Sequence, residues 1–189
     1  MDDVDRKIVS KLQSDGRATL QELAKNIGFT SMGVKKRLQK LKDQNYIQVS
    51  ALLNPFSFKL FPAIVMLEME NAEAMQNLVN RFRDCPRVVN IFKTMGGYNL
   101  IALVIAEDKD TFESISVEKC SLRSSQGIRR SEFYPISDIY FSPFLPVREH
   151  LTHKNRGVTP CNVDCTPCSR YENNKCVGCP ATRYYRGTL

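Results

Sequence analysis

The sequence lacks any apolar run long enough to cross a bilayer. Its longest uninterrupted apolar stretch, residues 100–106, is far shorter than the roughly 20 residues that a membrane-spanning helix needs. The acidic beginning, Met1-Asp2-Asp3, also lacks the basic and apolar regions of a secretory signal peptide. We therefore expect a cytoplasmic protein that has no membrane partner.

Recognisable catalytic signatures are missing as well. The sequence shows no glycine-rich phosphate loop, no serine, histidine and aspartate set that suggests a triad, and no conspicuous carboxylate pair. We therefore expect a protein that is not an enzyme. Its 189 residues, 42% hydrophobic and 25% charged, are typical of a globular chain with one large domain or two small ones.

Positive charge is concentrated towards the two ends of the chain. Residues 1–54 contain ten basic and six acidic side chains, residues 55–144 contain ten and eleven, and residues 145–189 contain seven and three. Basic ends around a neutral middle indicate a polyanionic partner. Seven cysteines in a protein expected in the cytoplasm favour metal binding or redox chemistry over structural disulfides.

Residues 19–45 have the pattern of a helix-turn-helix. Thr19 and Glu22 form a capping box that begins the first helix, and Gly28 is a typical helix end. Thr30 is the expected N-cap of the second helix. An earlier helix, capped by an aspartate near the N-terminus, should pack against this pair.

The second helix of the pair has a basic face. Its segment 31–42 contains five basic residues and no acidic one, while Val34, Leu38 and Leu41 form an apolar stripe. Such a helix suits the major groove, although an ordinary solvated helix is the alternative. Arg37 flanks the stripe, so an internal ion pair is as consistent with its position as a DNA contact. The predicted DNA-binding residues are Thr19, Thr30, Ser31, Met32, Lys35, Lys36, Arg37, Gln39 and Lys40.

The remaining pattern predicts an α+β protein. Alternation over residues 46–53 predicts a short strand, which makes residues 1–54 a winged helix-turn-helix, followed by a linker at 55–60. Residues 61–140 predict the order strand-helix-strand-strand-helix-strand of a ferredoxin-like βαββαβ domain. Its expected strands are 61–70, 88–94, 100–106 and 128–134. Two helices cover only one face of such a sheet, so we expect a second copy of the chain on the other face.

Residues 2–140 also resemble a known family. The matching residues are Asp5, Ile8, Asp15-Gly16-Arg17, Glu22-Leu23-Ala24, Ile27-Gly28, Val34, Arg37-Leu38, Leu41, Tyr46-Ile47 and Gly97-Tyr98-Asn99-Leu100. On these residues the chain is similar to the feast/famine transcription regulators of the Lrp/AsnC family. The resemblance implies binding to double-stranded DNA, a dimer formed by back-to-back sheets, and often further assembly.

The family also implies a small-molecule effector, commonly an amino acid, bound between the second domains. The residues that correspond to the family's effector turn are Gly96, Gly97, Tyr98 and Asn99. Asn99 stands where the family usually has aspartate. The missing carboxylate removes a natural partner for an α-ammonium group, so this departure counts against an ordinary amino-acid effector.

The tail, residues 161–189, is rich in cysteine and follows a predicted linker or extension at 141–160. Two Cys-x2-Cys pairs can converge on one tetrahedral zinc ion. The predicted ligands are Cys165, Cys168, Cys176 and Cys179, with Cys161 as the spare or a substitute. Ordering about 29 residues at roughly 1.5 kcal/mol each exceeds what the few large apolar side chains can offset. Zinc binding worth about 10–16 kcal/mol supplies part of the difference, and docking onto the body adds more.

An iron–sulfur cluster is the alternative cofactor. Four thiolates suit either centre, and Cys179-Pro180 resembles the Cys-Pro that closes ferredoxin motifs. His150 and His153 could replace a cysteine ligand, but we favour the cysteines. Cys85 and Cys120 fall on predicted helices, so we expect them to be buried and inert.

These patterns together predict a dimeric or larger DNA-binding transcription regulator whose tail holds a structural or sensing metal. The alternatives are an iron–sulfur redox protein, a redox-sensing regulator whose cluster carries the activity, and an RNA-binding or adaptor protein.

Overall fold

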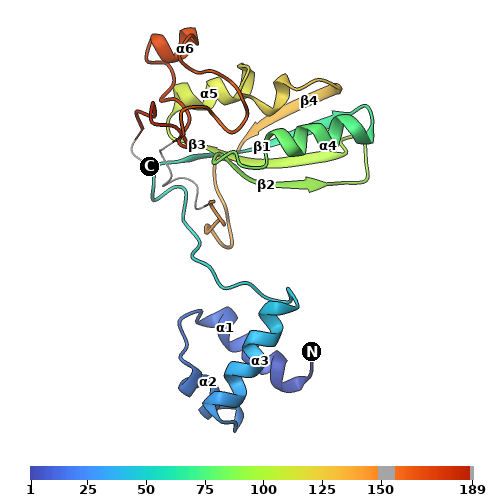
Figure 1. Ribbon diagram of the computed structural model, residues 1–189, viewed down its shortest axis with the longest axis vertical. Coiled ribbons are helices and arrows are strands. Elements are labelled where there is room, and N and C mark those ends of the chain that lie inside the picture. Colours follow the sequence, from blue (N-terminus) through green and yellow to red (C-terminus); the bar gives the residue numbers. More distant parts are fainter. Residues whose placement is uncertain (149–155, 188–189) are drawn as a thin grey trace. The chain divides into compact units, whose positions relative to one another are not determined.

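The computed structural model divides into two units, Met1–Ala51 and Leu52–Leu189 (Figure 1). It describes residues 1–148 and 156–187. Within those ranges no helix has the length and apolar character needed to cross a bilayer. Three features of the sequence analysis fall wholly or partly outside the described residues: His150, His153 and the extension at 141–160.

The first unit consists of three helices, as the sequence predicts. They are α1 (Asp3–Ser14), α2 (Leu20–Ile27) and α3 (Ser31–Asp43). Ile8 of α1, Leu23 of α2 and Val34 of α3 meet in a common core and are almost completely buried. Each helix therefore turns one apolar stripe inward and leaves its polar face exposed.

The predicted wing strand is wrong. Residues 46–52 are not in a strand, and Leu53 makes only an isolated bridge with Leu145. Tyr46 and Val49 stay 60% and 47% exposed. An alternating pattern gives a strand only when another strand lies beside it to accept and donate hydrogen bonds, and no strand among the described residues pairs with this segment. The first unit is therefore a helix-turn-helix without the predicted wing.

The second unit contains a four-stranded antiparallel sheet with strand order β2-β3-β1-β4. The strands are β1 (Phe61–Met69), β2 (Val88–Lys93), β3 (Leu100–Ala106) and β4 (Ile128–Pro135). Between them lie α4 (Ala72–Arg81), α5 (Lys109–Val117) and the short 3-10 helix η1 (Leu122–Ser124). This order agrees with the predicted βαββαβ arrangement.

Helices α4 and α5 pack on one face of the sheet. Val65 and Leu67 of β1 share a core with Leu78 of α4, Phe82 just beyond it, and Ile115 of α5. The alternating apolar residues of β1 thus lie beneath the helices. The opposite face carries partly exposed apolar residues of the two central strands: Ile64, Met66, Ile101 and Leu103.

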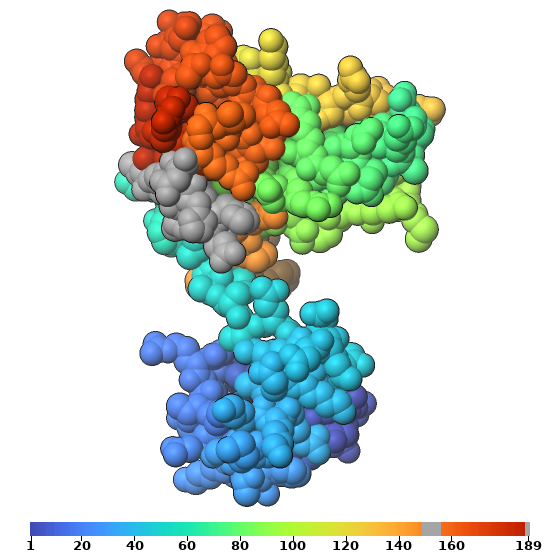
Figure 2. Space-filling model, in the orientation of Figure 1, coloured from blue at the N-terminus to red at the C-terminus, as the bar shows by residue number. Residues whose placement is uncertain are grey.

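The cysteine-rich tail is part of the second unit, not a separate body. It is mostly irregular, with one short helix, α6 (Ser169–Glu172). Figure 2 shows its orange and red surface directly against the surface of the sheet domain. Cys161 belongs to the same core cluster as Val65 and Leu78. The apolar core of the sheet domain therefore extends into the tail.

Candidate functional site

A basic, solvent-facing surface runs along α3. Lys35, Lys36 and Lys40 are exposed, as is Met32, at 61%. Gln39 is exposed too, and its Nε2 donates to Asp43 Oδ1 at 2.7 Å. A base contact by this amide would therefore replace a weak hydrogen bond within the helix.

Arg37 does not share this solvent-facing arrangement. Its Nη1 donates to Asp2 Oδ2 at 2.7 Å and to Asp5 Oδ1 at 2.9 Å, and its guanidinium lies 5.5 Å from the centre of the Phe29 ring. Hydrogen bonds to Asp2 and then Asp5 raise the pKa of Arg37 further above its usual range. Of the two roles that the sequence leaves open, the structure favours the internal ion pair, which ties α1 to α3.

The two predicted threonines act at helix ends. Thr19 Oγ1 accepts a hydrogen bond from the Glu22 amide at 3.2 Å and donates to the Glu22 carboxylate at 2.8 Å. Thr30 Oγ1 accepts from the Gly33 amide at 3.1 Å. Both hydroxyls are thus engaged in capping. Ser31 is the first residue of α3, where the helix dipole favours an anion such as phosphate.

The predicted effector turn lies between β2 and β3. Asn99 Nδ2 donates to the Met69 carbonyl at 2.9 Å, and Asn99 Oδ1 accepts from the Met69 amide at 2.8 Å. This pairing needs one donor and one acceptor, which an amide supplies and an ionised carboxylate does not. The departure from aspartate thus has a structural reason, and the Asn99 side chain is already engaged with β1.

A polar cluster surrounds the neighbouring Tyr98. The hydroxyls of Tyr98 and Tyr134 both donate to the Glu132 carboxylate, and Arg130 lies 4.3 Å from the centre of the Tyr98 ring. The bonds from Tyr134 and then Tyr98 hold the pKa of Glu132 below its usual value. A Cβ at Gly97 would lie 3.6 Å from Arg130, so the turn approaches this cluster closely.

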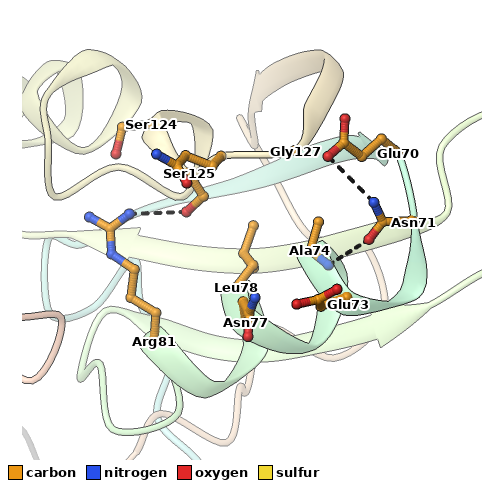
Figure 3. A pocket seen from close by; sticks show the side chains of 11 residues that line it. Glu70, Asn71, Glu73, Ala74, Asn77, Leu78, Arg81, Ser124, Ser125 and Gly127 are labelled. Carbon is orange, nitrogen blue, oxygen red and sulfur yellow. Dashed lines mark hydrogen bonds between the residues drawn. The ribbon is translucent and has the colours of Figure 1, made fainter.

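A groove of about 590 Å³ opens elsewhere, between α4 and the loop before β4 (Figure 3). Its lining includes Glu70 and Glu73 but no residue of the predicted effector turn. Arg81 crosses it, with Nη1 donating to Ser125 Oγ at 3.1 Å and Nη2 to the Lys119 carbonyl at 2.6 Å. Its guanidinium thus joins α4 to the loop.

The cysteines gather around two cavities beneath the tail. The larger has a volume of about 240 Å³ and the smaller about 50 Å³. Three thiols line both cavities: Cys120, Cys165 and Cys176. Cys168 lines only the larger, whereas Cys85, Cys161 and Cys179 line only the smaller. The four predicted ligands are therefore divided between two cavities instead of surrounding one.

Cys85 and Cys120 are partly buried and lie beyond the ends of α4 and α5, so their predicted placement on helices is wrong, and they line the cavities together with the cysteines of the tail. Burial raises the pKa of each thiol to about 12. The pKa of Cys165 also rises to about 12, through burial first and then through the nearby thiols, of which Cys120 has the largest influence. In the part of the chain that the structure describes, no three His, Cys, Asp or Glu side chains converge closely enough to hold one metal ion.

Arg170 anchors the tail to α5, and the sequence did not predict this contact. Arg170 Nε donates to Ser114 Oγ at 2.6 Å, and Nη2 contacts the Asp110 carbonyl at 3.0 Å and the Glu113 carboxylate at 2.8 Å. The signal available in the sequence was Thr111, a polar residue beside the apolar face of α5. It is fully buried, and its hydroxyl accepts from the Val177 amide at 3.1 Å.

A second anchor is the buried ion pair of Arg87 and Glu107. Arg87 Nε and Nη2 donate to the two Glu107 carboxylate oxygens at 2.9 and 3.0 Å. Nη2 also donates to the carbonyl of Gly178, between the last two cysteines of the tail. Burial lowers the pKa of Arg87, but the charges of Glu107 and of the nearby Cys176 and Cys179, together with the hydrogen bond to Glu107, raise it by more, so the guanidinium stays charged.

Comparisons with known proteins agree with both units. Residues 1–42 match the AsnC-type helix-turn-helix domain, and residues 62–141 match the Lrp/AsnC ligand binding domain. Together these matches span well over half of the chain, and neither extends into the tail.

Two curated relatives and one solved structure illustrate the likeness. The HTH-type transcriptional regulator FL11 of Pyrococcus abyssi is 27% identical over 119 residues, covering 60% of this chain and 76% of the relative. LrpA of Mycobacterium tuberculosis is 26% identical over 153 residues, covering 80% and 97%. A Neisseria meningitidis transcriptional regulator in complex with L-Met has a TM-score of 0.67 at 23% identity, covering 75% and 93%, which shows a shared fold.

The relatives decide the broad class of the protein. They are transcriptional regulators and not enzymes, which confirms that this chain is not an enzyme. Its two matched domains occur in the same order as the two units of the structure. The chain therefore belongs to the Lrp/AsnC family of transcriptional regulators.

Proposed function

We propose that this protein is a cytoplasmic regulator that binds specific duplex DNA through α3, as a homodimer or larger homo-oligomer. The observation that carries the proposal is the exposed basic surface of Lys35, Lys36 and Lys40, with Met32 and Gln39 beside it. Lysines supply phosphate contacts, and an amide supplies a base contact. In a dimer, the two helices would contact half-sites about 34 Å apart, or a multiple of that distance.

The face of the sheet opposite the helices supports the oligomer, although Leu145 and Val147 pack on part of it. Ile64 and Met66 of β1 lie beside Ile101 and Leu103 of β3, and all four are partly exposed. An apolar face without a covering helix is stabilised when a second copy of the chain buries it. We propose that this face forms the dimer interface.

A small-molecule effector belongs to the same proposal. The turn at Gly96 and Gly97 leads to Tyr98, whose hydroxyl joins Tyr134 at the Glu132 carboxylate. Exposed backbone at the glycines and this carboxylate are the groups available to a polar ligand. Asn99 contributes by fixing the turn to β1, since both ends of its amide are already paired.

We also propose a thiolate-bound metal in the tail, either zinc or an iron–sulfur cluster. The support is the two Cys-x2-Cys pairs and the gathering of thiols around the cavities beneath them. Thiolates are the preferred ligands of both centres. The metal would stabilise the tail or, if it is lost on oxidation, make the tail a redox sensor.

Salt titration of DNA binding tests the central part of the proposal. The Lys36→Ala variant should weaken binding to every sequence and reduce the slope of log affinity against log salt by about 1 per subunit, because each phosphate contact releases condensed counterions. Gln39→Ala should change sequence preference more than the slope. Lys7→Ala, which removes one exposed charge from α1, is the matched control.

Parent-like binding by Lys36→Ala at every salt concentration would reject α3 as the DNA-contacting helix. Competition between duplex DNA and RNA in the same assay separates the proposal from an RNA-binding role. Sedimentation of Ile101→Glu tests the interface, because a charge on this partly exposed face should convert the dimer to a monomer. An unchanged oligomer would place the interface elsewhere.

A further inference from the structure

Cys120 lies where the sheet domain meets the cysteines of the tail. It lies three residues beyond the end of α5 and lines both cavities together with Cys165 and Cys176. Cys168, by contrast, lines only the larger cavity, whose wall also includes Glu118, Lys119 and Asp164. The wall of the smaller cavity consists mostly of apolar side chains and thiols, with Arg87 and Thr159 as its polar members, and includes core residues of the domain.

We propose that Cys120 is a ligand of the tail's metal centre and that it replaces Cys168 in the set formed with Cys165, Cys176 and Cys179. This inference rests on the proposed thiolate metal and changes where that metal binds. All four thiols line the smaller cavity, together with Cys85 and Cys161. The centre would then join the sheet domain to the tail, instead of being contained within the tail.

The sheet domain fixes the chain on both sides of Cys176. The carbonyl of Lys175 accepts a hydrogen bond from Ser114 Oγ at 3.1 Å, and the amide of Val177 donates to Thr111 Oγ1 at 3.1 Å. Both hydroxyls come from α5. Cys176 is therefore held against the helix that Cys120 follows, by contacts that do not depend on a metal.

A corresponding contact holds the loop before Cys179. Arg87 donates to the carbonyl of Gly178 while its guanidinium remains paired with Glu107, and Arg87 itself lines the smaller cavity. Four thiolates around a divalent metal leave a net negative charge, which unbalanced carboxylates close by would oppose. Beside the smaller cavity Arg87 balances Glu107, whereas the wall of the larger cavity contains two carboxylates and one lysine, which favours the smaller cavity.

The smaller cavity has room for a metal ion to which the surrounding thiols can rotate. Its volume of about 50 Å³ exceeds the roughly 10–15 Å³ that one water needs. Because no three candidate ligands in the described ranges already converge on one point, binding requires thiols to rotate between staggered positions about the Cα–Cβ bond. The metal would displace the thiol protons as it binds.

Metal analysis of purified variants tests this assignment. The full-length parent, Cys120→Ser and Cys168→Ser are purified without oxygen, and their zinc, iron and acid-labile sulfide are measured beside a visible spectrum. We expect one centre per chain in the parent and in Cys168→Ser. We expect Cys120→Ser to lose it, or to release it to a chelator at more than tenfold lower chelator concentration.

The outcomes distinguish whether the tail binds a metal at all from whether Cys120 is one of its ligands. A colourless centre with zinc, or an absorbing centre with iron and sulfide, supports the inference if only the Cys120 variant loses it. Full retention by Cys120→Ser with loss from Cys168→Ser overturns it and restores the four tail cysteines, with the metal itself intact. A parent that binds neither zinc nor iron overturns both the inference and the proposed metal.

Folding of the variant is checked separately. Serine preserves the size of Cys120, and metal-free parent and Cys120→Ser should unfold at the same temperature if the cysteine acts only as a ligand. If the metal-free variant is less stable, Cys120→Ala provides a second measurement, because an apolar substitute suits the buried site but cannot bind metal. Metal bound with parent affinity by Cys120→Ala overturns the inference.

Discussion

The helix-turn-helix and the cysteine-rich tail both have strong sequence patterns, but the first pattern predicts which side chains are buried and the second does not predict which thiols meet. In α3, residues three and four apart share a face, so the spacing itself determines that Val34 is buried and Lys36 exposed. In the tail, the spacing of cysteines identifies neighbours along the chain only. The thiol that joins Cys165 and Cys176 at both cavities is Cys120, which lies far away in the sequence.

The two regions also differ in what fixes them. The first unit is ordered by its own three-helix core and by caps that each span three residues. The tail depends on contacts with residues that precede it by more than fifty positions, such as Arg170 with Ser114. A substitution in the sheet domain should therefore weaken the tail while leaving the helix-turn-helix intact.

The largest expected effect comes from Arg87→Ala. Removing the guanidinium leaves Glu107 buried without its partner, and the Gly178 carbonyl loses a donor. Breaking one side of a buried ion pair costs about 3–5 kcal/mol. Urea unfolding followed by circular dichroism should show this loss in the second unit and no change in the first. Arg83→Ala, which removes an exposed arginine that hydrogen-bonds to nearby Asn80, should be almost neutral. Equal effects from both variants would contradict the anchoring role.

A smaller effect confined to the tail is expected from Gly178→Ala. Gly178 has φ +83°, and a Cβ there would lie 3.0 Å from Cε2 of Tyr171. The left-handed backbone alone costs a non-glycine residue about 1–2 kcal/mol. Faster proteolysis of the tail, or faster amide exchange at Val177, measures the loosening. Gly157→Ala is the matched control, since its Cβ would meet nothing within 4 Å. Equal protection in both variants would show that the turn tolerates a side chain.

The successes and failures of prediction follow the same division between local and distant contacts. The helices, the order of helices and strands along the second unit, and the capping threonines depend on short-range patterns, and the sequence predicts them. The strand at 46–53 fails because alternation does not reveal whether a partner strand is present. The position of Cys176 depends on hydrogen bonds from Ser114 to the Lys175 carbonyl and from the Val177 amide to Thr111, both residues of α5. No spacing rule contains that information.

Because short-range contacts order the first unit, Thr30→Ala should lower the stability of that unit by a modest amount. The variant leaves the Gly33 amide without its side-chain acceptor, and loss of such a cap typically costs about 1 kcal/mol. Thr30→Asp retains an acceptor and should restore most of the stability. Thermal unfolding should show the change in the first unit alone. A shift of the second unit instead would contradict the independence of the two folding units.

The smallest expected effect is the response of the first unit to acid. The hydrogen bond from the Thr19 amide, followed by that from its hydroxyl, lowers the pKa of Glu22 below the reference value of 4.5. Because the folded form has the lower pKa, the stabilisation is fully present above about pH 4.5 and is lost as the pH falls through the folded value. In Glu22→Gln the capping box keeps an acceptor but no longer titrates. The stability of the first unit should therefore fall less steeply with decreasing pH than it does in the parent. Asp2, whose pKa is lowered by the Asp5 amide and then by Arg37, accounts for the part of the decline that remains. Unfolding measured from pH 3 to pH 7, roughly the range in which carboxylates titrate, checks this, and an unchanged decline in Glu22→Gln would remove Glu22 as its source.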